Sequence, residues 1–247
     1  LQTKNWAGDR DGAVRSGEEA LVIARELGLR EQEAYLSLDL PRVYRMGGHL
    51  PPSIWDTVRR GIELFRELGN RPMVADGLST VAVAQFGQGE YDAALRSGSE
   101  ALAISEEIGN LWGQSFSRFA TPFILFERGE WGAALREWET GIRLAREAGF
   151  RAGELGPGVD MAFAVHTAGD LGRALRLIEA PLALSETMGD IAFWPRAARA
   201  RVATGMGRLD EAREWVDRAA SGRVWLVVPN AIGLFHTARA ELELALG

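Results

Sequence analysis

Cysteine is absent from this chain of 247 residues, and its absence excludes disulfide bonds and thiolate metal sites. Long hydrophobic segments are missing as well, because no run approaches the roughly 18 residues that a membrane-spanning helix requires. No signal sequence is visible at the start of the chain. We therefore expect a cytoplasmic protein without a membrane partner.

Clusters of basic charge are also missing. The chain has 28 Lys and Arg against 34 Asp and Glu, a net charge of −6, and Lys4 is its one lysine. Acidic and basic residues alternate at helical spacing, as in Glu139, Arg143 and Glu147, which is typical of solvated helix faces. Because phosphate contacts require a clustered basic surface, we expect no direct binding of nucleic acid.

Residue groups that carry enzyme chemistry are scarce. His49, His166 and His236 lie in different parts of the sequence, each without a second ligand at metal-binding spacing. No glycine-rich phosphate loop with its lysine occurs. We therefore predict a non-catalytic chain that holds no metal and no cofactor.

Glycine, by contrast, is abundant and regularly placed. One series comprises Gly28, Gly69, Gly109, Gly149 and Gly189, with gaps of 41, 40, 40 and 40 residues. A second series follows nearly the same period at Gly8, Gly48, Gly89, Gly129, Gly169 and Gly207. Self-similarity of this length indicates stacked supersecondary units, and two glycine turns per period indicate two helices per repeat.

The segments between the glycines have helical periodicity and no strand-like alternation. Each segment begins after a turn, often with an acidic residue, and ends at the next glycine. The predicted helices span residues 10–27, 30–46, 52–68, 71–87, 91–108, 111–128, 131–148, 151–168, 171–188, 191–205, 208–221 and 229–246. The β-branched run 224–228 is too short and isolated to pair as a strand, and Pro229 is expected to open the last helix.

Small residues recur where neighbouring helices must touch. Pairs seven residues apart, two turns along one helical face, are Ala13 and Ala20, Ala94 and Ala101, Ala134 and Gly141, and Ala212 and Ala219. A further small residue lies twelve positions before the first small residue of the following helix, at Ala82 for Ala94, Ala162 for Ala174 and Ala200 for Ala212. This pattern resembles the tetratricopeptide repeat (TPR) family over essentially the whole chain. The resemblance implies an all-α, right-handed α-solenoid of antiparallel helix pairs, a single domain over residues 1–247 with about five to six repeats.

Two features depart from the TPR pattern. The period is about 40 residues rather than 34, which resembles the extended repeats in the sensor regions of large bacterial ATPase-type transcriptional activators, including the maltose-activator type, and of cyclase-linked regulators. Proline replaces the small residue at Pro41 and Pro122, where it removes a backbone hydrogen bond and crowds the carbonyl of Ser37 or Arg118. We expect kinks in the helices 30–46 and 111–128.

One predicted helix start is rich in helix-breaking residues. The stretch 153–158 contains Gly153, Gly156, Pro157 and Gly158. These residues are expected to fray or break the start of the helix 151–168, and a longer loop without function is the alternative.

The resemblance also implies a binding wall, because the first helix of each TPR pair lines the concave side of the superhelix. The wall residues that we single out are aromatic or basic: Phe116, Phe119, Phe123, Phe126, Phe163, His166, Trp194, Arg201, Arg42 and Arg45. Such a groove suits a peptide, a partner-protein helix or a small apolar effector, with some negative charge. The alternative is that the rings, and His166 with them, are buried against the adjacent repeat, as side chains at helical spacing often are.

These observations predict a recognition or sensor segment of a bacterial signalling or transcriptional regulator, in which a bound ligand changes the curvature of the superhelix. The chain starts at Leu1 rather than methionine, shortly before the turn at Gly8, and ends at Gly247, where the next turn is expected, so we expect a fragment of a larger protein, truncated at both ends. The alternative function is a structural module that joins identical copies through its terminal helices. The last helix carries the apolar residues for this role: Phe235, Ala238, Leu242 and Leu246.

Overall fold

The computed structural model describes residues 9–46, 53–188, 193–221 and 229–247. Within these ranges every regular element is an α-helix, which confirms the predicted all-α fold of paired helices. The β-branched run 224–228 lies outside the described residues. Two compact units make up the chain, Leu1–Gly149 and Phe150–Gly247, and we describe each by itself.

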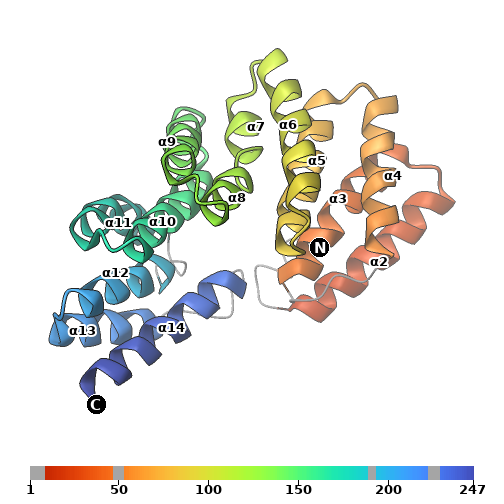
Figure 1. The fold of residues 1–247 in the computed structure, drawn as a ribbon. Helices are drawn as coiled ribbons and strands as arrows, with labels where there is room; N and C mark the ends of the chain where they lie inside the picture. The colour runs from red at the N-terminus through yellow and green to blue at the C-terminus, as the bar shows by residue number, and fades with distance from the viewer. Residues whose placement is uncertain (1–8, 47–52, 189–192, 222–228) are drawn as a thin grey trace. The chain divides into compact units, whose positions relative to one another are not determined.

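The first unit is a series of helices that are neighbours both in sequence and in space (Figure 1). In chain order they are α2 (Arg10–Glu26), α3 (Arg30–Met46), α4 (Ile54–Glu67), α5 (Arg71–Gly87), α6 (Tyr91–Glu107), α7 (Leu111–Phe116), α8 (Thr121–Glu127) and α9 (Trp131–Glu147). Helix α2 packs on α3, α3 on α4, α5 on α6, and α7 and α8 on α9. The core of this unit is therefore divided among successive helix pairs.

The second unit continues the same pairing of helices. It contains α10 (Arg151–Thr167), α11 (Leu171–Glu186), α12 (Phe193–Gly205), α13 (Leu209–Ala220) and α14 (Pro229–Leu246). Helix α10 packs on α11 and α12 packs on α13, while α14 lies against α12. Pro229 is the first residue of α14, as predicted. Phe235, Ala238 and Leu242 of α14 are buried in one cluster with Phe193 of α12.

Glycines in the left-handed conformation make the turns between the helices. All described members of the two glycine series have a positive φ, from 66° at Gly28 to 88° at Gly169. A side chain is strained in this conformation, so the period of glycines in the sequence marks the period of turns in the fold. Several helices then begin with a capping side chain. Asn70, Asn110 and Asp170 each accept a hydrogen bond from the backbone N–H three residues later, at 3.3, 3.1 and 2.9 Å.

The small residues lie at helix contacts, as their spacing predicted. Ala94 is buried in one cluster with Ala82 of the preceding helix, and Ala212 and Ala219 are buried in one cluster with Ala200. Methyl groups at these positions allow the helix axes to approach closely, which sets the spacing within each pair.

The predicted helix 111–128 is two helices, and this corrects the prediction of one kinked helix. α7 ends at Phe116, and α8 begins at Thr121. Pro122 has no N–H to donate to the carbonyl of Arg118, but in the first turn of α8 no such donor is needed. Pro41, in contrast, lies inside α3, which runs as one helix from Arg30 to Met46.

The expected fraying of the helix 151–168 is wrong, since α10 is continuous from Arg151 to Thr167. Its glycines lie where neighbouring helices come close. A Cβ atom at Gly156 would be 3.2 Å from Cη2 of Trp194, and one at Gly158 would be 2.8 Å from Cγ of Pro181. The absence of side chains lets α11 and α12 pack tightly on α10, and this packing outweighs the low helix propensity of glycine.

Candidate functional site

The break between α7 and α8 divides the four predicted phenylalanines of this region into two groups. Phe116, at the end of α7, meets Phe119 edge to face with ring centroids 5.0 Å apart, and Trp112 lies 5.2 Å from Phe116. Phe123 and Phe126 lie one turn apart on α8. All four phenylalanine side chains are half-buried. They therefore share a region of the first unit but not one face of a single helix.

Phe123 and Phe126 belong to an aromatic cluster that joins three helices. Phe123 stacks on Phe86 of α5 at 5.3 Å and meets Trp138 of α9 edge to face at 5.4 Å. Phe126 stacks on Trp131 of α9 at 5.4 Å. These contacts agree with the interpretation of the rings as packing between repeats. Their remaining exposure leaves apolar surface that a partner segment can cover.

Arg42 is held in an ion-pair network between α3 and α5. Its guanidinium donates hydrogen bonds to Asp39 at 3.3 Å, to Thr80 at 3.1 Å and to the carboxylate of Asp76. The Asp76 side chain is only 7% exposed, and burial raises the pKa of this carboxyl while the Arg42 charge opposes the rise. The charge of Arg42 is thus compensated within the first unit. Arg45 lies on the same helix, but its side chain is outside the described residues.

Three of the predicted wall residues come together in the second unit. Arg201 of α12 stands over the ring of Phe163 on α10, 4.8 Å from its centroid. The same guanidinium pairs with Glu241 of α14, with its Nε 2.7 Å from Oε2. His166 is half-buried one turn along α10 from Phe163, and burial, helped by the charge of Arg201, lowers its pKa. The imidazole is therefore largely neutral at pH 7.

Trp194 lies at the start of α12, half-buried against the hydrophobic clusters of the second unit. Its ring approaches α10 at Gly156, the glycine whose lack of a side chain makes room for the indole. The position agrees with a packing role for Trp194.

Asp160 is a titratable group that the sequence did not single out. Its side chain is half-buried on α10, and burial raises the pKa of the carboxyl to about 8. Among the residues that the structure describes, none donates a hydrogen bond to it. Nothing in the sequence separates Asp160 from the many solvated acidic residues, because only the packing around it makes it unusual.

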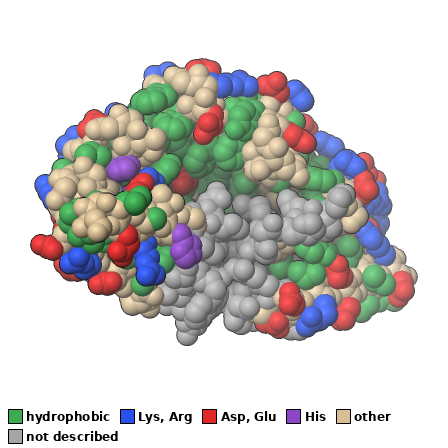
Figure 2. All heavy atoms as spheres, turned by 60° about the horizontal axis from the view of Figure 1, so that its bottom comes forward, with side chains coloured by type: hydrophobic (Ala, Val, Ile, Leu, Met, Phe, Trp, Pro, Cys, Tyr) green, Lys and Arg blue, Asp and Glu red, His purple; other side chains and the backbone are tan. Residues whose placement is uncertain are grey.

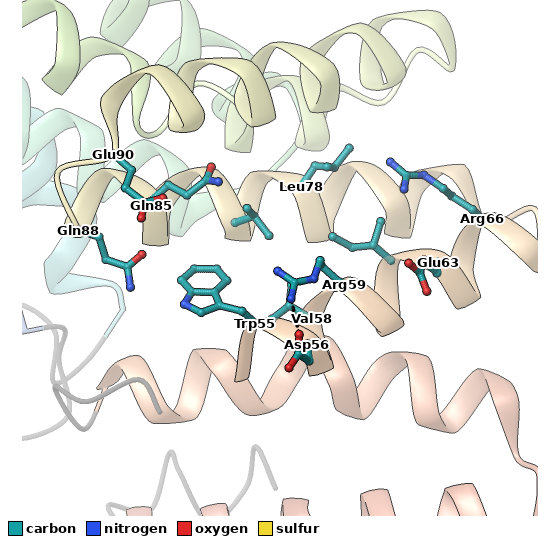
Figure 3. Close-up of a pocket in the computed structure, with 12 residues that line it drawn as sticks. Trp55, Asp56, Val58, Arg59, Glu63, Arg66, Leu78, Gln85, Gln88 and Glu90 are labelled. Carbon is teal, nitrogen blue, oxygen red and sulfur yellow. Dashed lines mark hydrogen bonds and ion pairs between the residues drawn. The ribbon is translucent and has the colours of Figure 1, made fainter. Parts of the chain in front are cut away.

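A cleft of about 640 Å³ opens between α4 and α5 in the first unit (Figure 3). Helix α4 supplies one face, with residues spaced by three or four positions: Trp55, Val58, Arg59, Ile62, Glu63 and Arg66, with Asp56 beside them. Helix α5 supplies Leu78, Val81 and Gln85, and the turn before α6 supplies Gln88 and Glu90. Sequence reasoning missed this site because it places binding surfaces on the first helix of each pair, whereas α4 is a second helix.

The floor of the cleft is apolar and its rim is polar. Val58, Ile62 and Leu78 are 1%, 5% and 7% exposed, and Trp55 and Val81 are half-buried. Asp56, Arg59, Glu63, Arg66, Gln88 and Glu90 are exposed around them. An apolar floor with a few polar groups around it is the usual composition of a binding site for an organic ligand or a peptide.

Charge and metal chemistry are unremarkable elsewhere on the described surface. Figure 2 shows arginine and acidic side chains interspersed on the face that it presents, in keeping with the alternation in the sequence. Over the described ranges, no three His, Asp or Glu side chains are placed to hold a metal ion. None of the helices there combines the length and the hydrophobicity needed to cross a membrane.

No family model matches the sequence, and no curated protein matches it. Solved structures do match the fold. BtubC (BKLC) from P. vanneervenii superposes with a TM-score of 0.68 at 16% identity, over 85% of this chain and 89% of that one. A putative kinesin light chain of Podosopora anserina with nearly identical TPR-like repeats has a TM-score of 0.51 at 16% identity, covering 76% of this chain and 95% of that one. A variant of that light chain gives 0.52 at 16% identity, over 76% and 94%. The fold is therefore that of TPR-like helical repeats.

Proposed function

We propose that this chain is a non-catalytic protein-binding repeat domain whose partner covers the rings of α7 and α8 in the first unit. The observation that carries the proposal is the half-buried state of Phe116, Phe119, Phe123 and Phe126. Aromatic side chains that are partly buried by their own chain are rigid, so a partner gains apolar contact without ordering them. The TPR-like fold supports a peptide or a partner helix as the occupant, and a small apolar effector fits the same surface.

A selection from a randomised peptide library tests this proposal. Peptides enriched on the full chain are titrated against the wild type, Phe119→Ser and the control Leu68→Ser, which removes a side chain that is 44% exposed at the end of α4. We expect Phe119→Ser to weaken at least one class of peptide about tenfold, the loss typical of a buried aromatic contact, and Leu68→Ser to leave it unchanged. Equal affinities for all three proteins, or no enriched peptide, would refute the assignment.

We further propose that the domain is the sensor or scaffold part of a bacterial regulator of signalling or transcription, with a cytoplasmic location. The support is the repeat length of about 40 residues, which resembles that of such sensor regions. The same register continues from Gly149 to Gly169, across the boundary of the two units, and supports their assignment to one repeat domain. If the full-length protein carries no effector or nucleic-acid-binding domain, this part of the proposal fails.

A second candidate function is an oligomerisation module. Helix α2 exposes Val22 and Ile23, and α14 exposes Leu244 to 83% and Leu246 to 41%, so both helices carry apolar surface suited to a second copy. Light scattering over a dilution series tests it, with Ile23→Glu and Leu244→Glu as variants. A module of this kind stays multimeric in the wild type and dissociates in the variants. A monomer at every concentration rules it out.

A further inference from the structure

We propose that the cleft between α4 and α5 is a second peptide-binding site, and that its occupant is an extended segment with an arginine or lysine at one end and aliphatic side chains along the rest. The site goes beyond the surface on α7 and α8, because it is built by other helices of the first unit. Its ligand chemistry follows from the arrangement of apolar and polar groups along the cleft (Figure 3).

The middle of the cleft recognises aliphatic side chains. Val58 and Ile62 from α4 and Leu78 and Val81 from α5 line this part of the cleft and form its apolar floor. A smaller, mostly apolar hollow beside it shares Trp55, Val58 and Val81 and extends the floor toward Pro41. Aliphatic side chains of a ligand that pack on this floor are removed from water. This removal is the main favourable contribution to the binding free energy of such contacts.

The length of the cleft suits a short extended segment. Its α4 wall runs from Trp55 to Arg66, a distance of roughly 16 Å at the helical rise of about 1.5 Å per residue. An extended chain advances about 3.3 Å per residue, so about five residues span the wall. A volume of about 640 Å³ lies within the usual range for a binding site.

The charges on the rim are compensated at every position except one. Arg59 pairs with Asp56, Arg66 pairs with Glu100 at 2.8 Å, and Glu63 lies 3.9 Å from Arg60. Glu90 differs from these residues, because no described residue forms an ion pair with it. It occupies the N-cap position of α6 without a side-chain capping bond, so its carboxylate is free to accept. The net charge that the cleft offers a ligand is therefore negative and sits at one end.

The groups around Glu90 complete a site for a cation. Figure 3 shows Trp55, Gln85 and Gln88 at the same end of the cleft as Glu90, with Leu78 and Arg66 toward the other end. An indole face attracts an ammonium or guanidinium group, and a carboxylate with an amide oxygen accepts its hydrogen bonds. Ser97 donates to Oε1 of Gln85 at 2.9 Å, which orients that amide and leaves its NH₂ group for a peptide carbonyl. A basic side chain is thus favoured at this end and an acidic one is repelled.

The test uses two glutamates that occupy equivalent positions in successive repeats. Glu90 and Glu130 are both exposed N-cap residues without a side-chain capping bond, at the start of α6 and of α9. Only Glu90 lines the cleft. Glu90→Arg and Glu130→Arg therefore make the same change of charge in matched local structures. A difference in peptide affinity between the two variants measures the contribution of the cleft.

A randomised heptapeptide library is selected on the full chain, and enriched peptides are labelled with fluorescein and titrated by fluorescence anisotropy. We expect a class with arginine or lysine at one end followed by valine, leucine or isoleucine. Glu90→Arg should weaken this class at least tenfold, Trp55→Leu about threefold, and Glu130→Arg not at all. Circular dichroism melting of each variant verifies that the fold is kept.

The outcomes separate this site from the surface on α7 and α8. Peptides that lose affinity in Glu90→Arg but keep it in Phe119→Ser support the cleft, whichever way the first proposal turns out. If the enriched peptides carry no basic residue, or bind Glu90→Arg as tightly as Glu130→Arg, the inference is overturned. Peptides that respond to Phe119→Ser alone leave the proposed function standing and eliminate the cleft.

Discussion

The guanidinium of Arg42 on α3 donates a hydrogen bond to the buried carboxylate of Asp76 on α5, one repeat later in the sequence. A residue that the TPR pattern places on a binding wall thus joins two successive repeats. The pairing also involves Thr80, whose hydroxyl accepts from the same guanidinium and donates to the carbonyl of Asp76 at 3.0 Å. Arg42 therefore belongs to the structure of the first unit.

Arg42→Met should destabilise the protein by about 2–3 kcal/mol at pH 7, because it leaves the Asp76 carboxylate buried without its cation. The double variant with Asp76→Asn removes the stranded charge and should recover most of the loss. Urea unfolding followed by circular dichroism measures both. Arg59→Met is the matched control, since the Arg59–Asp56 pair is exposed and its loss should be undetectable. A similar loss of stability in Arg42→Met and Arg59→Met would contradict a special role of the buried Arg42–Asp76 pair.

Two glycines inside second helices should respond to alanine with opposite signs. A Cβ atom at Gly61 would lie 2.7 Å from Cβ of Ser37 and 3.2 Å from the backbone oxygen of Ala34, so Gly61→Ala forces α3 and α4 apart. We expect a loss of about 1–3 kcal/mol. At Gly141 the nearest atom is 3.8 Å away, and Gly141→Ala should stabilise α9 by up to about 1 kcal/mol through helix propensity. Thermal unfolding measures the stability of the two variants. Changes in stability of the same sign in both variants would be inconsistent with these distances.

Asp160 should make the protein less stable as the pH rises. Its pKa in the folded state is about 8, above the ordinary value of 3.8, so folding favours the protonated carboxyl. The favourable contribution is complete below about pH 4 and is lost as the pH rises toward 8. Asp160→Asn should therefore be about as stable as the wild type at pH 4 and more stable at pH 9 by several kcal/mol, because one unit of pKa shift corresponds to about 1.4 kcal/mol.

Urea unfolding at pH 4, 7 and 9 measures this difference. Asp217→Asn, on the exposed side of α13, serves as the control and should follow the wild type at every pH. A difference between Asp160→Asn and the wild type that is constant from pH 4 to 9 would show that burial does not raise the pKa of this carboxyl.

The helix caps provide a further comparison. Asn110 accepts a hydrogen bond from the N–H of Gly113, so Asn110→Ala should cost about 1 kcal/mol. Glu130 occupies the N-cap of α9 without such a bond, and Glu130→Ala should have almost no effect. Chemical denaturation of both variants compares them directly. An equal cost at the two positions would mean that the capping bond contributes nothing.

Much of the fold could be predicted because its signals are local. A glycine with φ near 70° ends a helix wherever it occurs, so Gly69 and Gly109 mark turns before any packing is known. The alanines that lie at helix contacts repeat with the same period. Helix continuity was less predictable. Pro122 interrupts a helix and Pro41 does not, although both replace the same small residue.

The candidate sites were harder to predict because they depend on neighbours in other repeats. Arg42 and Arg201 were expected on a groove wall that suits a ligand with some negative charge, but each meets a carboxylate of this chain, 34 and 40 residues away. The sequence contains so many acidic residues that this spacing does not identify the partner. The cleft on α4 was missed for a related reason. Trp55, Val58 and Ile62 have the spacing of a core stripe, and only the packing of the neighbouring helices shows that a cleft lies beside that stripe.

The sequence by itself determined the helices, their order and the period of their turns, because glycine conformation, capping and small-residue spacing act over a few residues. The tertiary structure alone decided which charges are compensated, which carboxyl is buried and where a cleft remains. These properties depend on the distances between side chains about one repeat apart, and such distances are set by how closely the helices pack.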